Sequence, residues 1–256
     1  MAFMRIDGLA VDVNGSGTPV VLLHGLGGTL SVWEPQAVQL AERFRVVRYD
    51  ARGSGGSPAE TAPTMESWVG DLTRLLDELA IGRAHLVGHS LGTLVLQHLA
   101  ARFPERVASL SLLGVNRSPP PSRRAAVLQR AEQVRREGVC SIVDALLASG
   151  PSAHSRVHAP AAMAAIREMV SRQRDREYAW SCEAMANSNP ADLSKLDAPI
   201  LLVAGAADTI SPPQLSRDLG AEQPRARVIE LANCGHWMPL EQPDATTQAL
   251  IAFLAG

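Results

Sequence analysis

The sequence predicts an α/β protein whose mostly parallel sheet carries helices on both faces. Compact apolar runs such as PVVLL at 19–23 and PILLVA at 199–204 suit strands that are buried on both sides. Segments with the spacing of amphipathic helices alternate with these runs. Because a crossover helix between two strands makes them parallel, the alternation indicates βαβ units.

The predicted strands are short apolar runs, several of them bounded by glycine-rich turns. In chain order they cover 9–14, 19–23, 45–49, 84–87, 107–113, 199–204 and 227–231. The predicted helices repeat apolar residues every three or four positions. They cover 31–44, 65–79, 91–102, a segment that begins near Pro212, and 244–254. In the helix at 65–79, the apolar residues from Trp68 to Leu79 fall on one face.

The alternation of strands and helices stops between 116 and 190, where we expect helices and no strand. The proline run Ser118-Pro119-Pro120-Pro121 begins this stretch, and segments rich in arginine and alanine fill it. We interpret it as a helical insertion in the α/β core.

The composition favours one globular domain and argues against several functions. The chain has 256 residues, 46% of them hydrophobic, which is enough for one well-buried core. A net charge of -2 does not suggest a nucleic-acid-binding surface. No stretch reaches about 18 uncharged apolar residues, so no membrane span is expected. Three cysteines without metal-like spacing, and no leader-like start, predict a cytoplasmic protein without a disulfide framework or a metal site.

The strongest functional signal is Gly88-His89-Ser90-Leu91-Gly92, a G-x-S-x-G motif between a predicted strand and a predicted helix. The apex of so sharp a turn needs strained backbone angles, and flanking glycines avoid Cβ clashes. The turn lifts the Ser90 hydroxyl to a helix N-terminus, which favours developing negative charge. The motif therefore predicts a nucleophilic serine, with an ordinary glycine-rich connection as the alternative.

Such a serine needs backbone N–H groups to hold an oxyanion. One is expected from Leu91, directly after the nucleophile. The other is expected from the loop His24-Gly25-Leu26-Gly27-Gly28, which follows a central strand, and we predict the Leu26 N–H.

The serine also needs a base, and His236 is the best candidate among seven histidines. It lies late in the chain, in a loop after the last predicted strand. Asp208 follows the strand PILLVA and can accept a hydrogen bond from the second nitrogen of His236, which would fix its tautomer. Asp192 and Asp197 precede that strand, so we expect them at the opposite end of the sheet.

Taken together, the motifs resemble the α/β-hydrolase fold family over nearly the whole chain. HGLGG, DARGSGGS, GHSLG, GAADTISPP and NCGHWMPLEQPD occur in the family's order. The resemblance implies an eight-stranded, mostly parallel sheet with a helical cap inserted after the sixth strand. It implies a core at 1–115 and 190–256 and a cap at 116–189. The family's site residues carry over to Ser90, Asp208 and His236, with oxyanion donors at Leu26 and Leu91 and no cofactor.

Within the family, the chain looks most similar to 3-oxoadipate enol-lactonases and related lactone and ester hydrolases. Segments 130–147 and 178–186 resemble helices of that group's cap. The likeness implies a serine hydrolase that acts on a small ester or lactone. From the composition we expect no nucleic-acid or membrane partner, and whether the chain forms a homo-oligomer is left open. The residues expected to contact the substrate are Gly25, His89, Trp180 and Trp237.

Other functions stay open at this point. The same three side chains could serve carbon–carbon bond hydrolysis, perhydrolysis as in cofactor-free haloperoxidases, or hydroxynitrile cleavage, because the pocket decides the chemistry. The chain could also be a receptor that binds a small molecule without turnover. Such a receptor would need the pocket but not the three reactive side chains.

Overall fold

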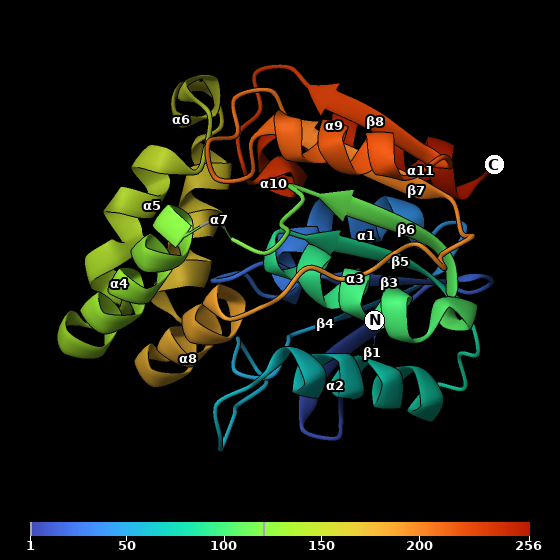
Figure 1. Ribbon diagram of the computed structural model, residues 1–256, viewed down its shortest axis with the longest axis horizontal. Coiled ribbons are helices and arrows are strands. Elements are labelled where there is room, and N and C mark those ends of the chain that lie inside the picture. The colour runs from blue at the N-terminus through green and yellow to red at the C-terminus, as the bar shows by residue number, and fades with distance from the viewer. Residues whose placement is uncertain (1, 120) are drawn as a thin grey trace.

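The structure is a computed structural model that describes residues 2–119 and 121–256; Met1, and Pro120 of the proline run, lie outside the described residues. Eight strands of the described residues form one sheet in the order β1-β2-β4-β3-β5-β6-β7-β8 (Figure 1). Strands β1 and β2 run antiparallel, as do β2 and β4, and all other neighbours run parallel. Their bounds are Ala2–Ile6, Leu9–Asn14, Pro19–Leu23, Arg45–Tyr49, Ala84–His89, Val107–Leu113, Ile200–Gly205 and Ala226–Leu231, from β1 to β8.

The strands agree with the predicted ones to within two residues, except for β1, which the sequence analysis did not predict. This strand forms through a tight hairpin. Asp7 and Gly8 both have positive φ, 47° and 77°, as the common two-residue hairpin turn requires, and Ile6 pairs with Leu9. The Asp-Gly dipeptide was therefore the signal for the missing strand.

Helices cover both faces of the sheet because successive strand residues point to opposite sides. On β3, Val21 and Leu23 belong to a buried cluster that includes residues of α2, α3 and α9, whereas Val20 and Leu22 belong to a second cluster that includes residues of α1 and α11. The helices of the core are η1 (Leu30–Trp33), α1 (Glu34–Leu40), α2 (Met65–Glu78), α3 (Leu91–Arg102), η2 (Pro104–Arg106), α9 (Pro213–Glu222), α10 (Met238–Glu241) and α11 (Pro243–Leu254).

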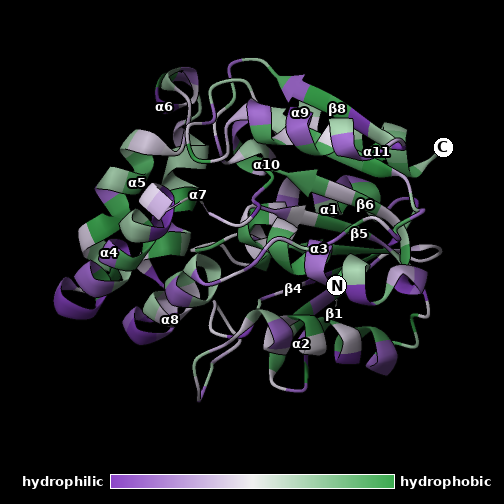
Figure 2. Ribbon diagram, viewed as in Figure 1, coloured by the Kyte–Doolittle hydropathy of each residue, from purple (hydrophilic) through white to green (hydrophobic). Residues whose placement is uncertain are grey.

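A helical cap follows the sixth strand, as predicted. Its helices lie beyond the carboxyl ends of the parallel strands, and α4 packs along α8 (Figure 1). They are α4 (Pro121–Glu137), η3 (Val139–Ile142), α5 (Val143–Ser149), α6 (Ala153–His158), α7 (Pro160–Ser171) and α8 (Asp175–Ala186). Figure 2 shows hydrophobic residues along the central strands and hydrophilic ones on the outer parts of α4 and α8.

No helix within the described ranges is long and apolar enough to cross a membrane.

Candidate active site

Ser90 lies at the apex of a sharp turn between β5 and α3. Its φ of 52° and ψ of -113° are strained for a residue with a side chain. The flanking glycines permit this turn, because a Cβ at Gly88 would lie 2.8 Å from the Gly92 carbonyl carbon, and a Cβ at Gly92 would lie 2.5 Å from the Leu23 oxygen. The Ser90 N–H donates to the Leu113 carbonyl at 2.9 Å, which ties the turn to β6.

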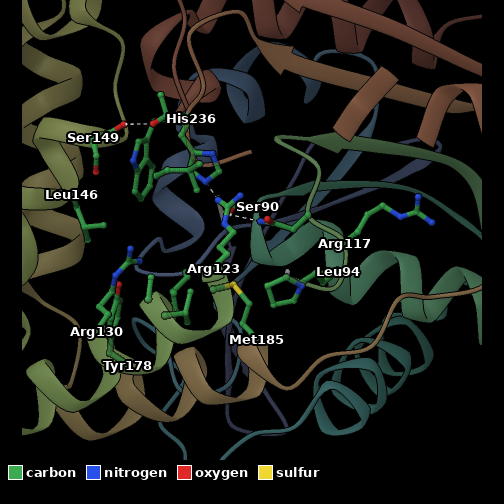
Figure 3. Close-up of a pocket in the computed structure, with 18 residues that line it drawn as sticks. Ser90, Leu94, Arg117, Arg123, Arg130, Leu146, Ser149, Tyr178, Met185 and His236 are labelled. Atoms are coloured by element: carbon green, nitrogen blue, oxygen red, sulfur yellow. Dashed lines mark hydrogen bonds between the residues drawn. The ribbon is translucent and has the colours of Figure 1, made fainter. Parts of the chain in front are cut away.

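The structure brings Ser90, His236 and Asp208 together from three separate loops. The Nε2 atom of His236 lies 2.8 Å from Ser90 Oγ (Figure 3). Its Nδ1 atom lies 2.9 Å from Asp208 Oδ2. All three residues are buried. The spacing lets the imidazole accept the serine proton while the carboxylate holds its other side.

Asp208 stays ionised although it is buried. Burial alone raises its pKa, but His236 and the N–H groups of Ile210 and Ser211 outweigh that effect, so the net pKa is lowered. Each of these N–H groups donates to Asp208 Oδ1 at 2.8 Å. The Oδ2 atom is thereby left for His236.

The predicted oxyanion donors border the same site. Leu91 is the first residue of α3, where an N–H has no partner within the helix. Leu26 lines the cavity in front of Ser90, and no hydrogen bond from its N–H occurs among the described residues. A Cβ at Gly25 would lie 2.8 Å from the Ser90 Cβ, so only glycine lets this loop approach the serine so closely.

Two buried histidines support the loops of the site from behind. His24 Nε2 accepts a hydrogen bond from the Ala51 N–H at 3.0 Å, so its Nδ1 carries the hydrogen and donates to the Gly25 carbonyl at 2.8 Å. His89 Nε2 donates to the His236 carbonyl at 2.7 Å. Burial lowers the pKa of His89 to about 3, and the neighbouring His236 acts in the same direction, so His89 stays neutral.

The neutral, buried His89 predicts that acid destabilises the protein. Its pKa is 6.5 in a model peptide and about 3 when folded, so between these values the unfolded chain binds a proton that the folded chain does not. The free energy of unfolding should therefore fall as the pH drops below 6.5 towards 3, by about 1.4 kcal/mol per pH unit from this residue. In urea titrations, His89→Gln should show a shallower dependence on pH than the wild type. Equal slopes would contradict this assignment.

Glu241 connects the cap to the loop that carries His236. Its Oε2 accepts from the N–H groups of Ser152, in the cap, and Gly235, each at 2.8 Å, and its Oε1 accepts from the Trp237 N–H at 2.8 Å. The His236 N–H also donates to a cap carbonyl, that of Gly150, at 2.8 Å. The cap therefore helps to position the imidazole.

Asn116, which the sequence analysis did not single out, contacts the serine directly. Its Nδ2 donates to Ser90 Oγ at 3.2 Å, and its Oδ1 accepts from the Ser211 hydroxyl at 3.3 Å. An amide nitrogen can only donate, so the Ser90 hydroxyl hydrogen must point elsewhere, towards His236. The only sequence signal for Asn116 was its position shortly after the strand β6, because none of the motifs includes it.

A cavity of about 350 Å³ opens between Ser90 and the cap, a size that suits a small ligand. Apolar groups from core and cap form much of its wall. The residues that line it are Leu26, Ser90, Leu94, Asn116, Arg117, Pro119, Arg123, Ala126, Val127, Arg130, Leu146, Ser149, Tyr178, Met185, Thr209, Ile210, His236 and Trp237.

The four residues predicted to contact the substrate lie in different places. Trp237 lines the cavity, but Gly25 and His89 lie behind the site and support it. The prediction for Trp180 is wrong, because this side chain faces a separate surface groove and stacks with Arg176. Positions 178 and 180 are about 200° apart around a helix, so Tyr178 points into the cavity instead.

Comparisons with known proteins agree with the α/β fold described above. A sequence model of the family described as alpha/beta hydrolase fold matches residues 18–243. A solved structure, the enol-lactonase from Burkholderia xenovorans LB400, is 31% identical, with full coverage of both chains and a TM-score of 0.88.

Two curated relatives differ in the reactions that their names state. A Caulobacter vibrioides protein that carries the name carbamate hydrolase RutD is 29% identical over 100% of this chain and 98% of its own length. A Mycobacterium tuberculosis protein that carries the name non-heme bromoperoxidase BpoC is 28% identical over 97% of this chain and 98% of its own.

Proposed function

The chain belongs to the alpha/beta hydrolase fold family, and we propose that it hydrolyses a small carboxylic ester or lactone through Ser90, His236 and Asp208. The observation that carries the proposal is the pair of contacts around the imidazole, 2.8 Å to Ser90 Oγ and 2.9 Å to Asp208 Oδ2. They place a base against an otherwise weak nucleophile. The cavity beside Ser90 has room for a substrate of modest size.

In the first half of the reaction, Ser90 Oγ attacks the carbonyl carbon while its proton passes to His236 Nε2. The carbonyl oxygen becomes negative and accepts hydrogen bonds from the N–H groups of Leu26 and Leu91. When the tetrahedral intermediate collapses, the bond to the alcohol oxygen breaks, and that oxygen takes the proton from His236. The acyl group is then an ester of Ser90.

In the second half, water attacks the acyl carbon and gives its proton to His236. The bond between the acyl carbon and Ser90 Oγ breaks, and Oγ recovers its proton from the imidazole. Asp208 stabilises the imidazolium in both halves without taking up the proton. The products are a carboxylic acid and an alcohol, or a hydroxy or oxo acid from a lactone.

The similar enol-lactonase and the carbamate hydrolase support a carbonyl substrate. An enol-lactone is a cyclic ester, so the same two steps open it, and 3-oxoadipate enol-lactone is our candidate of this class. We take residues 116–189 as a cap that encloses the substrate over a core made of 1–115 and 190–256.

An activity-based probe tests the proposal. A fluorophosphonate should label the wild type at Ser90 with one probe per chain, and hydrolysis of p-nitrophenyl acetate should stop as the label accumulates. Labelling without turnover of any ester or lactone would favour perhydrolysis or another reaction of this fold. Tight ligand binding without labelling would favour a receptor.

A further inference from the structure

The cap helix α4 presents two arginines to the cavity beside Ser90. Arg123 and Arg130 are seven positions apart, two turns of a helix, and share one face with Ala126 and Val127; all four line the cavity. Figure 3 shows the Arg123 side chain directed towards Ser90 and His236, and Arg130 beside Tyr178.

These guanidinium groups have no carboxylate partner in the cavity. No aspartate or glutamate is among the residues that line it. Among ion pairs within the described part of the chain, none involves Arg123 or Arg130, whereas Arg117, at the cavity's edge, pairs with Glu222 at 2.6 Å and points away from Ser90 (Figure 3). Outside the cavity, Arg135 and Arg136 of the same helix both pair with glutamates.

The nearby carboxylate, Asp208, is already engaged. It attracts Arg123, but its oxygens serve His236 and the N–H groups of Ile210 and Ser211. Burial lowers the pKa of Arg123 in spite of this attraction. A partly desolvated cation without a counter-ion is unfavourable, and a bound anion would remove that cost.

Beyond hydrolysis itself, we propose that Arg123 and Arg130 bind a carboxylate of the substrate, so that the enzyme prefers esters and lactones that carry a carboxylate besides the carbonyl it cleaves. A guanidinium suits this role because its planar N–H groups match the two oxygens of a carboxylate. The apolar wall formed by Leu94, Leu146 and Met185 would then hold the carbon chain between the two ends. This inference rests on the proposed function of the same site.

The test compares charged and neutral substrates of matched size. Monoethyl succinate carries the carboxylate on the acyl side and acetoxyacetate carries it on the alcohol side; diethyl succinate and methyl acetoxyacetate are their neutral partners. The wild type should favour at least one charged ester over its neutral partner in kcat/KM by roughly 10- to 100-fold. The Arg123→Gln/Arg130→Gln variant should lose this preference, mainly through KM.

Arg136→Gln is the matched control, because this residue lies on the same helix with its side chain 73% exposed and outside the cavity. It should retain the preference of the wild type. Fluorophosphonate labelling of Ser90 in every variant checks that the site is still assembled. Equal kcat/KM for charged and neutral esters in the wild type would overturn the inference while leaving the proposed function intact.

Calorimetric titration with glutarate separates binding from catalysis. Glutarate should bind the wild type and bind the double arginine variant at least about tenfold more weakly. The same affinity in both proteins would overturn the arginine site. Arginine-dependent glutarate binding together with no ester or lactone hydrolysis would instead overturn the proposed function and leave the anion site standing.

Discussion

Replacing Ser90 with alanine is expected to lower kcat for ester hydrolysis by about 10⁴- to 10⁶-fold. The variant keeps the cavity, the oxyanion N–H groups and the imidazole, but no oxygen remains to form the acyl-enzyme. Residual turnover would come from binding and oxyanion stabilisation alone. Stopped-flow and steady-state assays with p-nitrophenyl acetate measure the loss, and the initial burst should disappear.

Ser111→Ala is the matched control for this substitution. Ser111 is also a buried serine, on the neighbouring strand β6, and its Oγ has no hydrogen-bond partner among the described residues. Removing that hydroxyl should leave kcat within about twofold of the wild type, since surface and core changes away from a site act mainly on stability. Activity that survives in Ser90→Ala, with a circular dichroism spectrum like the wild type, would rule out Ser90 as the nucleophile.

The second large effect is expected for Asp208→Asn, which should lower kcat by roughly 10³- to 10⁴-fold. The N–H groups of Ile210 and Ser211 require an oxygen opposite them, so the new amide oxygen should stay at the Oδ1 position. The amide nitrogen would then face His236 Nδ1 and donate to it. That contact selects the tautomer with hydrogen on Nε2, which cannot accept the proton of Ser90.

Asp197→Asn serves as the control for Asp208. The sequence analysis expected this aspartate at the opposite end of the sheet from Asp208. It lies before β7 with its side chain 96% exposed and pairs with Arg225. Its replacement should leave kcat unchanged and affect stability by less than about 1 kcal/mol. Comparable losses in both variants would mean that Asp208 does not act through His236 in particular. The losses should be measured with a saturating ester, so that kcat and KM are separated.

Much of the α/β core could be predicted because its signals are local. Apolar runs identify the buried strands, helical periodicity identifies the covering helices, and the alternation of the two makes the sheet parallel. The strand β1 was missed although four of its five residues, AFMRI, are apolar, because the turn at Asp7-Gly8 was not recognised as a hairpin. The order of the strands follows from no local feature; the structure places β3 between β4 and β5.

The candidate site also contains residues that the sequence predicted and residues that it did not. Ser90, Asp208 and His236 each follow a predicted strand, so parallel strands were bound to place them at one edge of the sheet. Asn116 follows β6 at that edge too, but nothing in its surroundings distinguished it. In the cap, the prediction for Trp180 was wrong because the rotation of α8 about its own axis was unknown. Tyr178, two positions earlier on the same helix, lines the cavity instead.

Local patterns were enough to identify seven of the eight strands, the strained turn that carries a serine, and the late histidine and aspartate that can serve it. These properties depend on neighbours along the chain and on the direction of parallel strands. The face of α4 that meets the cavity became known from the packing of the folded chain. Arg123 and Arg130 line the cavity without a carboxylate partner in its wall, whereas Arg135 and Arg136 form ion pairs outside it. The rotation of a cap helix is set by how its side chains pack against distant ones, a property that no local pattern records.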